Sequence, residues 1–469
     1  MAMAARASVR GSENRAGCGP KIHWLRHCSI SHWGASDGGR STDGMHSRRV
    51  KIAGKVRIFP SAYVCFGVSG SKIALIKENG CGVELDGKGP TRLSIRVAMD
   101  ARYIREKPSG IGTYTQALVD RLPRAGASDQ FIFWRHRLAP RPLSPGRNTM
   151  DIAVRPGPTS PLPVFWPRHY APFGEIDVFH SPNNMMPRGL PCPAVITVHD
   201  VMAIERPEFH MQGLEQVAKK WYCQQALWRA LRGATRLITP TRATADRICA
   251  IAPDAAARVR VIWEAAEPSF APAQDQEGLQ KKAFLLTGSA APYLLLVGAN
   301  PPVKRHSLAM AAFAAKVPMP WRLVLLQRRR AGKGLRSLAS DLGIAHRIVC
   351  LDAVAHQDVV TLLQAAGALI HPSVYEGFGL PILEAMACGC PVVASDIPPF
   401  REITARATLL FPPDNLPALA TALSDVVRSP ERRRSLSEHG LARARDFSWD
   451  RAARETLEVY HDATSAGHR

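Results

Sequence analysis

Glu376 and Glu384 are the residues whose type and spacing point most directly to chemistry, because they stand eight positions apart on either side of a glycine turn. Carboxylates accept pairs of hydrogen bonds from vicinal diols, so two that converge suit one sugar-like ligand. A simpler interpretation has Glu376 solvated and Glu384 complementing a helix dipole. That interpretation explains each glutamate alone but not the pattern around them.

The turn between the two glutamates is suited to exposing backbone amides. Gly377 and Gly379 allow the backbone to approach a ligand closely. Pro381 fits the first turn of a helix predicted over 381–388, and a buried strand predicted over 368–371 leads into the turn. The loop amides and the helix N-terminus therefore face the top of a sheet, where they can hold a phosphate or sugar hydroxyls.

Strands alternate with helices over most of the chain, which predicts parallel sheets with both faces covered. The first series has predicted strands at 94–100, 176–180, 194–198, 236–240 and 259–262, helices at 113–122 and 214–231, and a loop at 108–112. The second has predicted strands at 293–297, 321–326, 348–351, 368–371 and 392–394, and helices at 306–314, 335–342, 359–366 and 381–388. A polar stretch at 271–290 is the predicted linker. Two Rossmann-like halves follow, with ligands expected at the carboxyl ends of the strands.

Composition excludes several classes of protein. The chain has 469 residues, of which 46% are hydrophobic and 21% charged, so it is globular rather than disordered or collagen-like. It has no apolar run near about 18 residues, so no membrane-spanning helix is expected. Its ten cysteines form no C-x-x-C pair, and Cys388 and Cys390 give only C-x-C, which disfavours a zinc site.

The net charge of +22 favours anionic partners: nucleic acid, phosphorylated small molecules or an anionic membrane surface. An arginine-rich composition inherited from the genome explains it equally well. About two-fifths of this charge lies in residues 1–92, which lack a secretory signal. We predict that 1–92 is an atypical, poorly ordered basic extension, either a functional arm or a stretch outside the native domain.

The pattern from Glu376 to Glu384 resembles the E-x7-E signature of the retaining, family-4 type glycosyltransferases of group 1, mannosyltransferases among them. Further segments resemble the same family, in order, over about 93–462: Val97–Arg102, Ser109–Tyr114, Val198–Asp200, Ile238–Thr241, Leu296–Lys304, Ala394–Pro398, Arg401–Ile403 and Phe447–Trp449. Each segment is weak alone, but their order and spacing are specific. The resemblance implies an α/β protein with the GT-B fold, in which two Rossmann-like domains face each other across a cleft.

The family's organisation divides the chain into four parts. Residues 1–92 are the basic extension, and 93–275 correspond to an N-terminal, acceptor-binding Rossmann-like domain. Residues 276–446 correspond to a C-terminal domain that binds the nucleotide-sugar donor. Residues 447–469 form a C-terminal helix expected to pack back on the N-terminal domain.

The resemblance also implies roles for individual residues. Glu376 and His199 would lie beside the transferred sugar as catalytic residues, although a satisfied core histidine also explains His199. The donor-binding residues would be Lys304 on the diphosphate, Glu384 on the ribose, the loop amides of Gly377, Phe378, Gly379 and Leu380, and the basic-loop positions Gly298 and Arg305. Gly110 and Gly112 would form a loop over the donor phosphate or the acceptor, or else a plain tight turn.

The implied activity is retaining transfer of a sugar from a GDP- or UDP-sugar, with mannose the first expectation, to a saccharide or lipid-linked acceptor in polysaccharide or glycoconjugate synthesis. No cofactor and no metal are expected, because a cation and oriented amides can stabilise the departing diphosphate. Same-face displacement and a covalent intermediate on Glu376 both remain open. The alternatives are another GT-B enzyme, such as a nucleotide-sugar epimerase or a phosphorylase, and a basic nucleic-acid-binding protein, for which no motif is present.

Two departures from the family pattern affect these expectations. Val303 precedes Lys304 where many relatives have arginine, so phosphate contacts are expected to shift to Arg305 or to the arginines at 328–330. A solvated loop also explains the run at 328–330. The segment 263–266 reads Trp-Glu-Ala-Ala in place of a proline-asparagine-glycine turn.

Basic residues raise the question of a membrane. A predicted helix from Leu214 to Arg236 and a proline-rich loop carry them: Lys219, Lys220, Arg229, Arg232 and Arg236, and Arg135, Arg137, Arg141 and Arg147. The helix suits an anionic membrane surface or ordinary solvent equally well. The protein is expected to be cytoplasmic and, if it binds the membrane, peripheral at the inner face of the cytoplasmic membrane.

Overall fold

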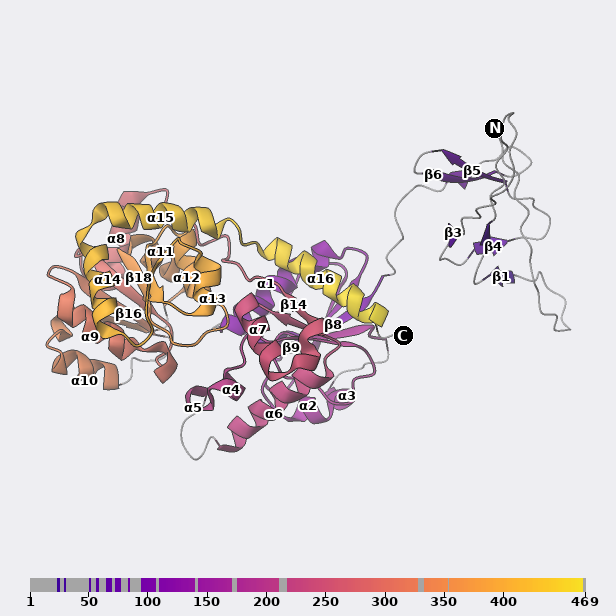
Figure 1. Cartoon of the computed structure of the whole chain (residues 1–469), viewed down its shortest axis with the longest axis horizontal. Coiled ribbons are helices and arrows are strands. Elements are labelled where there is room, and N and C mark those ends of the chain that lie inside the picture. The colour runs from indigo at the N-terminus through magenta and orange to yellow at the C-terminus, as the bar shows by residue number, and fades with distance from the viewer. Residues whose placement is uncertain are drawn as a thin grey trace, which may run out of the picture. The chain divides into compact units, whose positions relative to one another are not determined.

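Figure 1 shows the computed structural model of the chain, which divides into two compact units, Met1–Leu93 and Ser94–Arg469. The described residues of the second unit are 94–106, 109–139, 142–170, 175–210, 217–327, 333–352 and 354–466. Those of the first are the short strands β1 (His23–Leu25), β2 (Ser29–Ile30), β3 (Val50–Lys51), β4 (Val56–Ile58), β5 (Cys65–Ser69), β6 (Lys72–Ile76) and β7 (Val83–Glu84). These strands pair antiparallel. The predicted poor order of 1–92 concerns positions outside the described residues.

The second unit begins with a seven-stranded parallel sheet in the order β10-β9-β8-β11-β12-β13-β14, which we call the N-domain sheet. Its strands are β8 (Arg96–Asp100), β9 (Gln130–His136), β10 (Thr149–Val154), β11 (Val178–Ser181), β12 (Ala194–Thr197), β13 (Arg236–Thr239) and β14 (Val259–Val261). The helices of this domain are η1 (Ala101–Tyr103), α1 (Gly110–Ala125), α2 (Leu162–Phe165), α3 (Pro167–Tyr170), α4 (Met202–Glu205), α5 (Pro207–His210), α6 (Val217–Gly233), α7 (Arg242–Ile251) and η3 (Pro253–Arg258).

A second parallel sheet, the C-domain sheet, has six strands in the order β17-β16-β15-β18-β19-β20. Its strands are β15 (Tyr293–Val297), β16 (Arg322–Gln327), β17 (Ile348–Asp352), β18 (Ala368–His371), β19 (Val392–Ser395) and β20 (Leu409–Phe411). The helices are α8 (Gln276–Thr287), η4 (Pro302–Lys304), α9 (His306–Lys316), α10 (Lys333–Asp341), η5 (Ala345–Arg347), α11 (His356–Ala365), α12 (Leu380–Ala387), α13 (Pro398–Thr404), α14 (Leu416–Arg428) and α15 (Pro430–Ala444). This strand order is that of a doubly wound Rossmann sheet, and its topological switch point lies between β15 and β18.

Apolar residues explain why β15 and β18 occupy the centre of the C-domain sheet. The first four of the five residues of β15 are buried, and Leu295 pairs with Leu369 of β18. Strands buried on both faces in this way read as continuous apolar runs. The last helix, α16 (Trp449–Ala466), packs against α1 of the N-domain and buries Tyr460 completely.

The structure corrects several predicted elements. The predicted linker at 271–290 contains helix α8, which Asp275 caps by accepting a hydrogen bond from the amide of Gly278. Its Leu279, Ala283 and Thr287 are buried, but Phe284 and Leu285 are exposed, so its apolar residues do not mark a single helix face.

One residue of each predicted basic group also lies in a different element. Arg135 is buried within β9 rather than in a loop, and its guanidinium lies 3.8 Å from Asp151. Arg236 begins β13 rather than ending a helix, and it forms an ion pair with Asp462 of α16. Leu214 and Arg141 lie outside the described residues. Among the described helices, none is long and apolar enough to cross a membrane.

Candidate functional site

Lys304 and Glu376 meet at the switch point of the C-domain sheet. Lys304 ends the short helix η4, which follows β15, and Glu376 lies in the loop that follows β18. The Lys304 ammonium forms an ion pair with Oε1 of Glu376, and both side chains are about one-fifth exposed. The amide of Val374 donates to the carbonyl of Val303 at 3.0 Å, which ties the two loops together.

The charge on Glu376 is fixed by its neighbours. Burial by itself raises the pKa of Glu376, but the Lys304 ammonium and a hydrogen bond from Nε2 of His371, at 3.4 Å, outweigh it. The pKa of Glu376 therefore lies well below its usual range, and the side chain is a carboxylate at neutral pH. Burial lowers the pKa of His371, which favours the neutral imidazole that donates this bond.

Lys304, which is expected to contact a donor diphosphate, forms its ion pair with Glu376. Arg305 was expected to share the phosphate contacts. It forms a two-pronged pair with Asp414, with nitrogen–oxygen distances of 2.6 and 3.0 Å, and its guanidinium lies 5.6 Å from the ring of Phe209. The arginines at 328–330 lie outside the described residues.

The loop from Gly377 to Leu380 presents backbone rather than side chains. Gly379 is the N-cap of α12 and has φ of +120°, a conformation that L-residues rarely adopt. Phe378 is buried, with its ring 6.1 Å from that of Phe447, so only its peptide groups remain for a ligand. Leu380 is the first residue of α12 and Glu384 lies one turn further, half-buried.

Gly377 is a glycine for a different reason. Its φ is not positive, but a Cβ built on it would lie 1.7 Å from the carbonyl oxygen of His199 in the N-domain. No side chain fits in that space. Gly298, directly after β15, has φ of +117° and open space around it, so its requirement is conformational.

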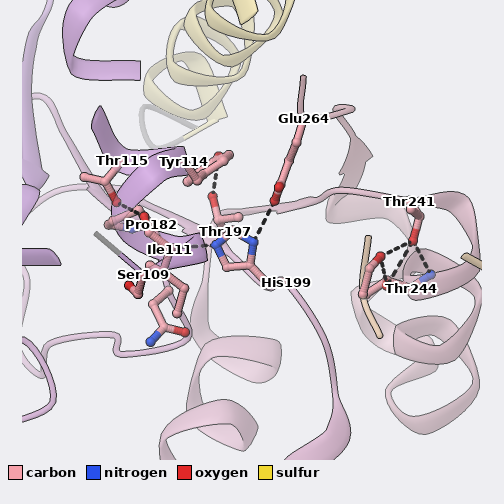
Figure 2. Close-up of polar contacts among 12 residues, drawn as sticks. Ser109, Ile111, Tyr114, Thr115, Pro182, Thr197, His199, Thr241, Thr244 and Glu264 are labelled. Carbon is pink, nitrogen blue, oxygen red and sulfur yellow. Dashed lines mark hydrogen bonds and ion pairs between the residues drawn. The ribbon is translucent and has the colours of Figure 1, made fainter. Parts of the chain in front are cut away.

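His199 follows β12 and uses both of its ring nitrogens (Figure 2). Nδ1 lies 3.0 Å from Oε1 of Glu264, and Nε2 lies 2.9 Å from the carbonyl oxygen of Pro182. Burial lowers the pKa of His199, but the hydrogen bond and charge of Glu264 outweigh it, so that the pKa is raised. Nε2 must donate to the carbonyl, and a protonated Nδ1 donates to the carboxylate.

Glu264 was not predicted from the sequence as a partner of His199. The signal was present, since Glu264 falls in the segment that departs from the family's turn. Its side chain is only 4% exposed, so the structure places a carboxylate beside the histidine in a nearly dry setting.

A series of buried, hydrogen-bonded side chains leads to the ring that packs against His199. Tyr460 of α16 bonds Nδ1 of His180 at 2.7 Å, Nε2 of His180 bonds the Thr197 hydroxyl at 2.9 Å, and Thr197 bonds the Tyr114 hydroxyl at 2.9 Å. The ring of Tyr114 packs edge-on against His199, with centroids 4.9 Å apart. Burial, and then the nearby His199, lower the pKa of His180 to about 3, so His180 is neutral. This hydrogen-bonded series supports the position of His199, and no sequence motif marks it.

Gly110 and Gly112 do not form a loop. They lie in the first turn of α1, where Ser109 is the N-cap and accepts from the amide of Gly112 at 3.1 Å. Figure 2 shows Ser109 and the bond from Thr115 to the carbonyl of Ile111, which continues the helix. The expectation of a glycine loop was wrong, because Ser109 caps the helix and α1 therefore begins at Gly110.

No group of three or more histidine, cysteine, aspartate and glutamate side chains that could hold a metal ion occurs among the residues described. Of the predicted site residues, the structure brings together Glu376, Lys304 and the loop from Gly377 to Leu380. It also places the carbonyl oxygen of His199 against Gly377.

Comparison with known proteins assigns a family model to each domain. Residues 280–443 match Glycosyl transferases group 1, and residues 108–269 match Glycosyltransferase Family 4. The chain is 28% identical over 291 residues to the O-antigen chain mannosyltransferase B of Escherichia coli, covering 60% of this chain and 74% of that protein.

Two further similarities extend this result. The chain is 27% identical over 314 residues to the MMP alpha-(1->4)-mannosyltransferase of Mycolicibacterium hassiacum, covering 62% of this chain and 71% of that protein. In fold it is similar to sucrose-phosphate synthase from Thermosynechococcus elongatus, with a TM-score of 0.64 and 19% identity, over 79% of this chain and all of the other. The predicted α/β architecture with two Rossmann-like domains of the GT-B type is confirmed.

Proposed function

Because this chain belongs to the glycosyltransferases of group 1 and family 4, we propose that it transfers a hexose from a nucleotide diphosphate sugar, with retention of anomeric configuration and without a metal ion. The observation that carries the proposal is the Lys304–Glu376 ion pair at the switch point of the C-domain sheet, beside the amides that lead into α12. Ligands of doubly wound sheets bind at this position.

The residues of the pair have complementary tasks. When the bond between the anomeric carbon and the diphosphate oxygen breaks, its electron pair goes to that oxygen, and Lys304 supplies a cation for the growing charge. The acceptor hydroxyl oxygen bonds to the anomeric carbon, and its proton passes to a phosphate oxygen of the leaving group. Glu376, which is ionised, stabilises positive charge on the sugar rather than donating a proton. In a double displacement the same carboxylate would be the nucleophile.

Mannose is the proposed sugar, since both relatives named above are mannosyltransferases. GDP-mannose is the first donor to test and UDP-sugars are the next. The proposed acceptor is a saccharide or a lipid-linked saccharide in polysaccharide or glycoconjugate synthesis.

A lipid-linked acceptor would require the protein to reach an anionic membrane surface, and helix α6 supports that proposal. Its seventeen residues include Lys219, Lys220, Arg229 and Arg232 but no acidic residue, and Trp221 is 63% exposed. Cations attract anionic lipid, and tryptophan favours the membrane interface. The full chain should sediment with vesicles of phosphatidylglycerol but not of phosphatidylcholine, and Trp221→Ser should weaken this binding.

The donor assay uses the full chain with a panel of GDP- and UDP-sugars, with and without EDTA. We expect release of one nucleoside diphosphate, unchanged by EDTA and lost in Glu376→Gln. Glu277→Gln is the matched control, because Glu277 is an exposed glutamate of α8 that pairs with Lys281 of the same helix. NMR of the product's anomeric proton reads the stereochemistry. Turnover of no donor, or equal turnover by Glu376→Gln, would refute the proposal.

A further inference from the structure

Two threonines of the N-domain hold the carbonyl of Gly377 in the C-domain. Thr241, at the end of the turn after β13, donates from Oγ1 to the Gly377 oxygen at 2.8 Å. Thr244 lies 3.3 Å from the same oxygen through its own hydroxyl. The amide of Thr244 donates to Oγ1 of Thr241 at 3.1 Å, so that Thr241 also caps α7. Both threonines are fully buried, and Figure 2 shows their hydroxyls facing each other.

A glutamate of the C-domain holds the same helix start from the other side. Glu402 of α13 accepts the amides of Arg242 and Ala243 at 2.9 and 3.0 Å, and the indole NH of Trp263 at 3.0 Å. A carboxylate at a helix N-terminus satisfies free amides and complements the helix dipole. The start of α7 is therefore bonded to two separate segments of the C-domain.

Tyr375, on the other side of Glu376, is also held by the N-domain. Its hydroxyl donates to Oε2 of Glu205 at 2.9 Å, and the guanidinium of Arg247 lies 4.3 Å from the centre of its ring. Arg247 belongs to α7, and it also lies 3.7 Å from Glu205. Both chain neighbours of Glu376 are thus fixed by the N-domain, while Glu376 itself binds Lys304 of its own domain.

We propose that Thr241 and Thr244 are positioning residues for the transfer reaction, which set the orientation of the Gly377 peptide and with it the carboxylate of Glu376. The proposal rests on the proposed function. In a planar trans peptide the carbonyl and the following N–H point in opposite directions, so two bonds to the Gly377 oxygen also fix the direction of the Phe378 amide. No hydrogen bond of that amide occurs among the described residues, which leaves it free to act on the transferred sugar as charge develops in the reaction, rather than to hold the diphosphate.

This arrangement separates donor binding from reaction. The C-domain retains its own ion pair and helix N-terminus when the two threonine bonds are lost, so affinity for a nucleoside diphosphate should stay nearly unchanged. The reacting geometry depends on both domains, and a displacement of about 1 Å at a reacting group costs about 100-fold in rate. Loss of one hydroxyl should therefore appear in kcat and not in KM.

The experiment compares Thr244→Val with Thr244→Ser in the full chain. The valine variant removes the hydroxyl and keeps the size, and the serine variant restores the hydroxyl. We expect kcat to fall about 10- to 100-fold in Thr244→Val, with donor KM and the Kd for GDP or UDP within about threefold, and to recover in Thr244→Ser. Thr361→Val is the matched control, since Thr361 is a buried threonine whose hydroxyl bonds a carbonyl of its own helix at 3.0 Å.

A second readout keeps the proposal testable without turnover. Hydrogen exchange of the amides at 375–380 should accelerate in Thr244→Val and not in Thr361→Val. Wild-type kcat in Thr244→Val, or a fall in kcat that Thr244→Ser does not recover, would overturn the positioning role. If the wild type turns over no donor, the proposed function fails, and unchanged exchange in Thr244→Val would then overturn the contact separately.

Discussion

Gly377→Ala tests whether the two domains meet at this residue when the enzyme reacts. A Cβ at position 377 would lie 1.7 Å from the carbonyl oxygen of His199 and 2.7 Å from its carbonyl carbon. These atoms belong to the backbone and cannot swing aside as a flexible side chain can. The methyl group must therefore push the two domains apart at this contact by more than about 1 Å.

The size of the effect follows from the bonds that this shift breaks. The hydrogen bond from Thr241 to Gly377 is 2.8 Å long, so a shift of about 1 Å or more takes it beyond bonding distance. The weaker bond from Thr244, at 3.3 Å, is lost with it. At about 1 kcal/mol net for each bond, the closed contact loses about 2 kcal/mol, and the displacement of Glu376 adds its own cost. A displacement of about 1 Å at a reacting group already costs about 100-fold, so kcat should fall by at least about 100-fold.

The assay is steady-state release of nucleoside diphosphate, with calorimetric titration of the same diphosphate. Gly334→Ala is the control, because Gly334 lies in α10 with open space where a Cβ would be. Affinity for the diphosphate should change little in Gly377→Ala, since the added methyl group faces the N-domain. A folded Gly377→Ala enzyme with kcat within about threefold of the wild type would refute the contact in the reacting state.

Three further predictions concern charge and helix structure. Lys304→Met should shift the acid limb of the kcat–pH profile to higher pH, because burial raises the pKa of Glu376 once its cation is removed. Glu264→Gln should remove the raised pKa of His199. A raised histidine pKa adds stability below about pH 6.5 that is lost as pH rises through the folded value, so the difference in urea midpoint between wild type and Glu264→Gln should be larger at about pH 6 than at about pH 9. Gly110→Ala should raise the thermal midpoint, since the residue lies in the first turn of α1 with free space for a methyl group and alanine is favoured there by about 0.5–1 kcal/mol.

The central strands of the C-domain could be predicted to the residue. The sequence bounds of 293–297 and 368–371 are those of β15 and β18, because both are short apolar runs that directly follow Pro292 and Gly367. Strand β9 was missed although it reads Gln-Phe-Ile-Phe-Trp-Arg-His. Its arginine and the prolines that follow suggested a loop. The carboxylate of Asp151 and the carbonyl of His136 make the buried cation of Arg135 tolerable in the strand.

The candidate site, too, has one part that the sequence predicts and one that it does not. Glu376 and the glycine turn form a continuous segment, so their grouping is a local property that a sequence pattern can reveal. Glu264 and Glu402 act on residues 65 and 160 positions away, through contacts that depend on which strand ends are neighbours. The local sequence singles out the segments 263–266 and 401–403, but it does not show that their glutamates contact His199 or the start of α7. Their roles require the packing of the two domains.

The two glycines of the turn show why a correct motif can still have the wrong physical reason. A glycine in a turn predicts freedom of φ, and this is true of Gly379, whose φ of +120° strains any other residue. Gly377 has no such φ, and it is glycine because the backbone of His199 leaves no room for a side chain. One glycine is thus required within the C-domain alone, and the other only while the N-domain is in contact. Two glycines of the E-x7-E segment, two residues apart, therefore have different structural roles. Gly379 is needed for the fold of the donor loop, and Gly377 is needed for the contact between the two domains.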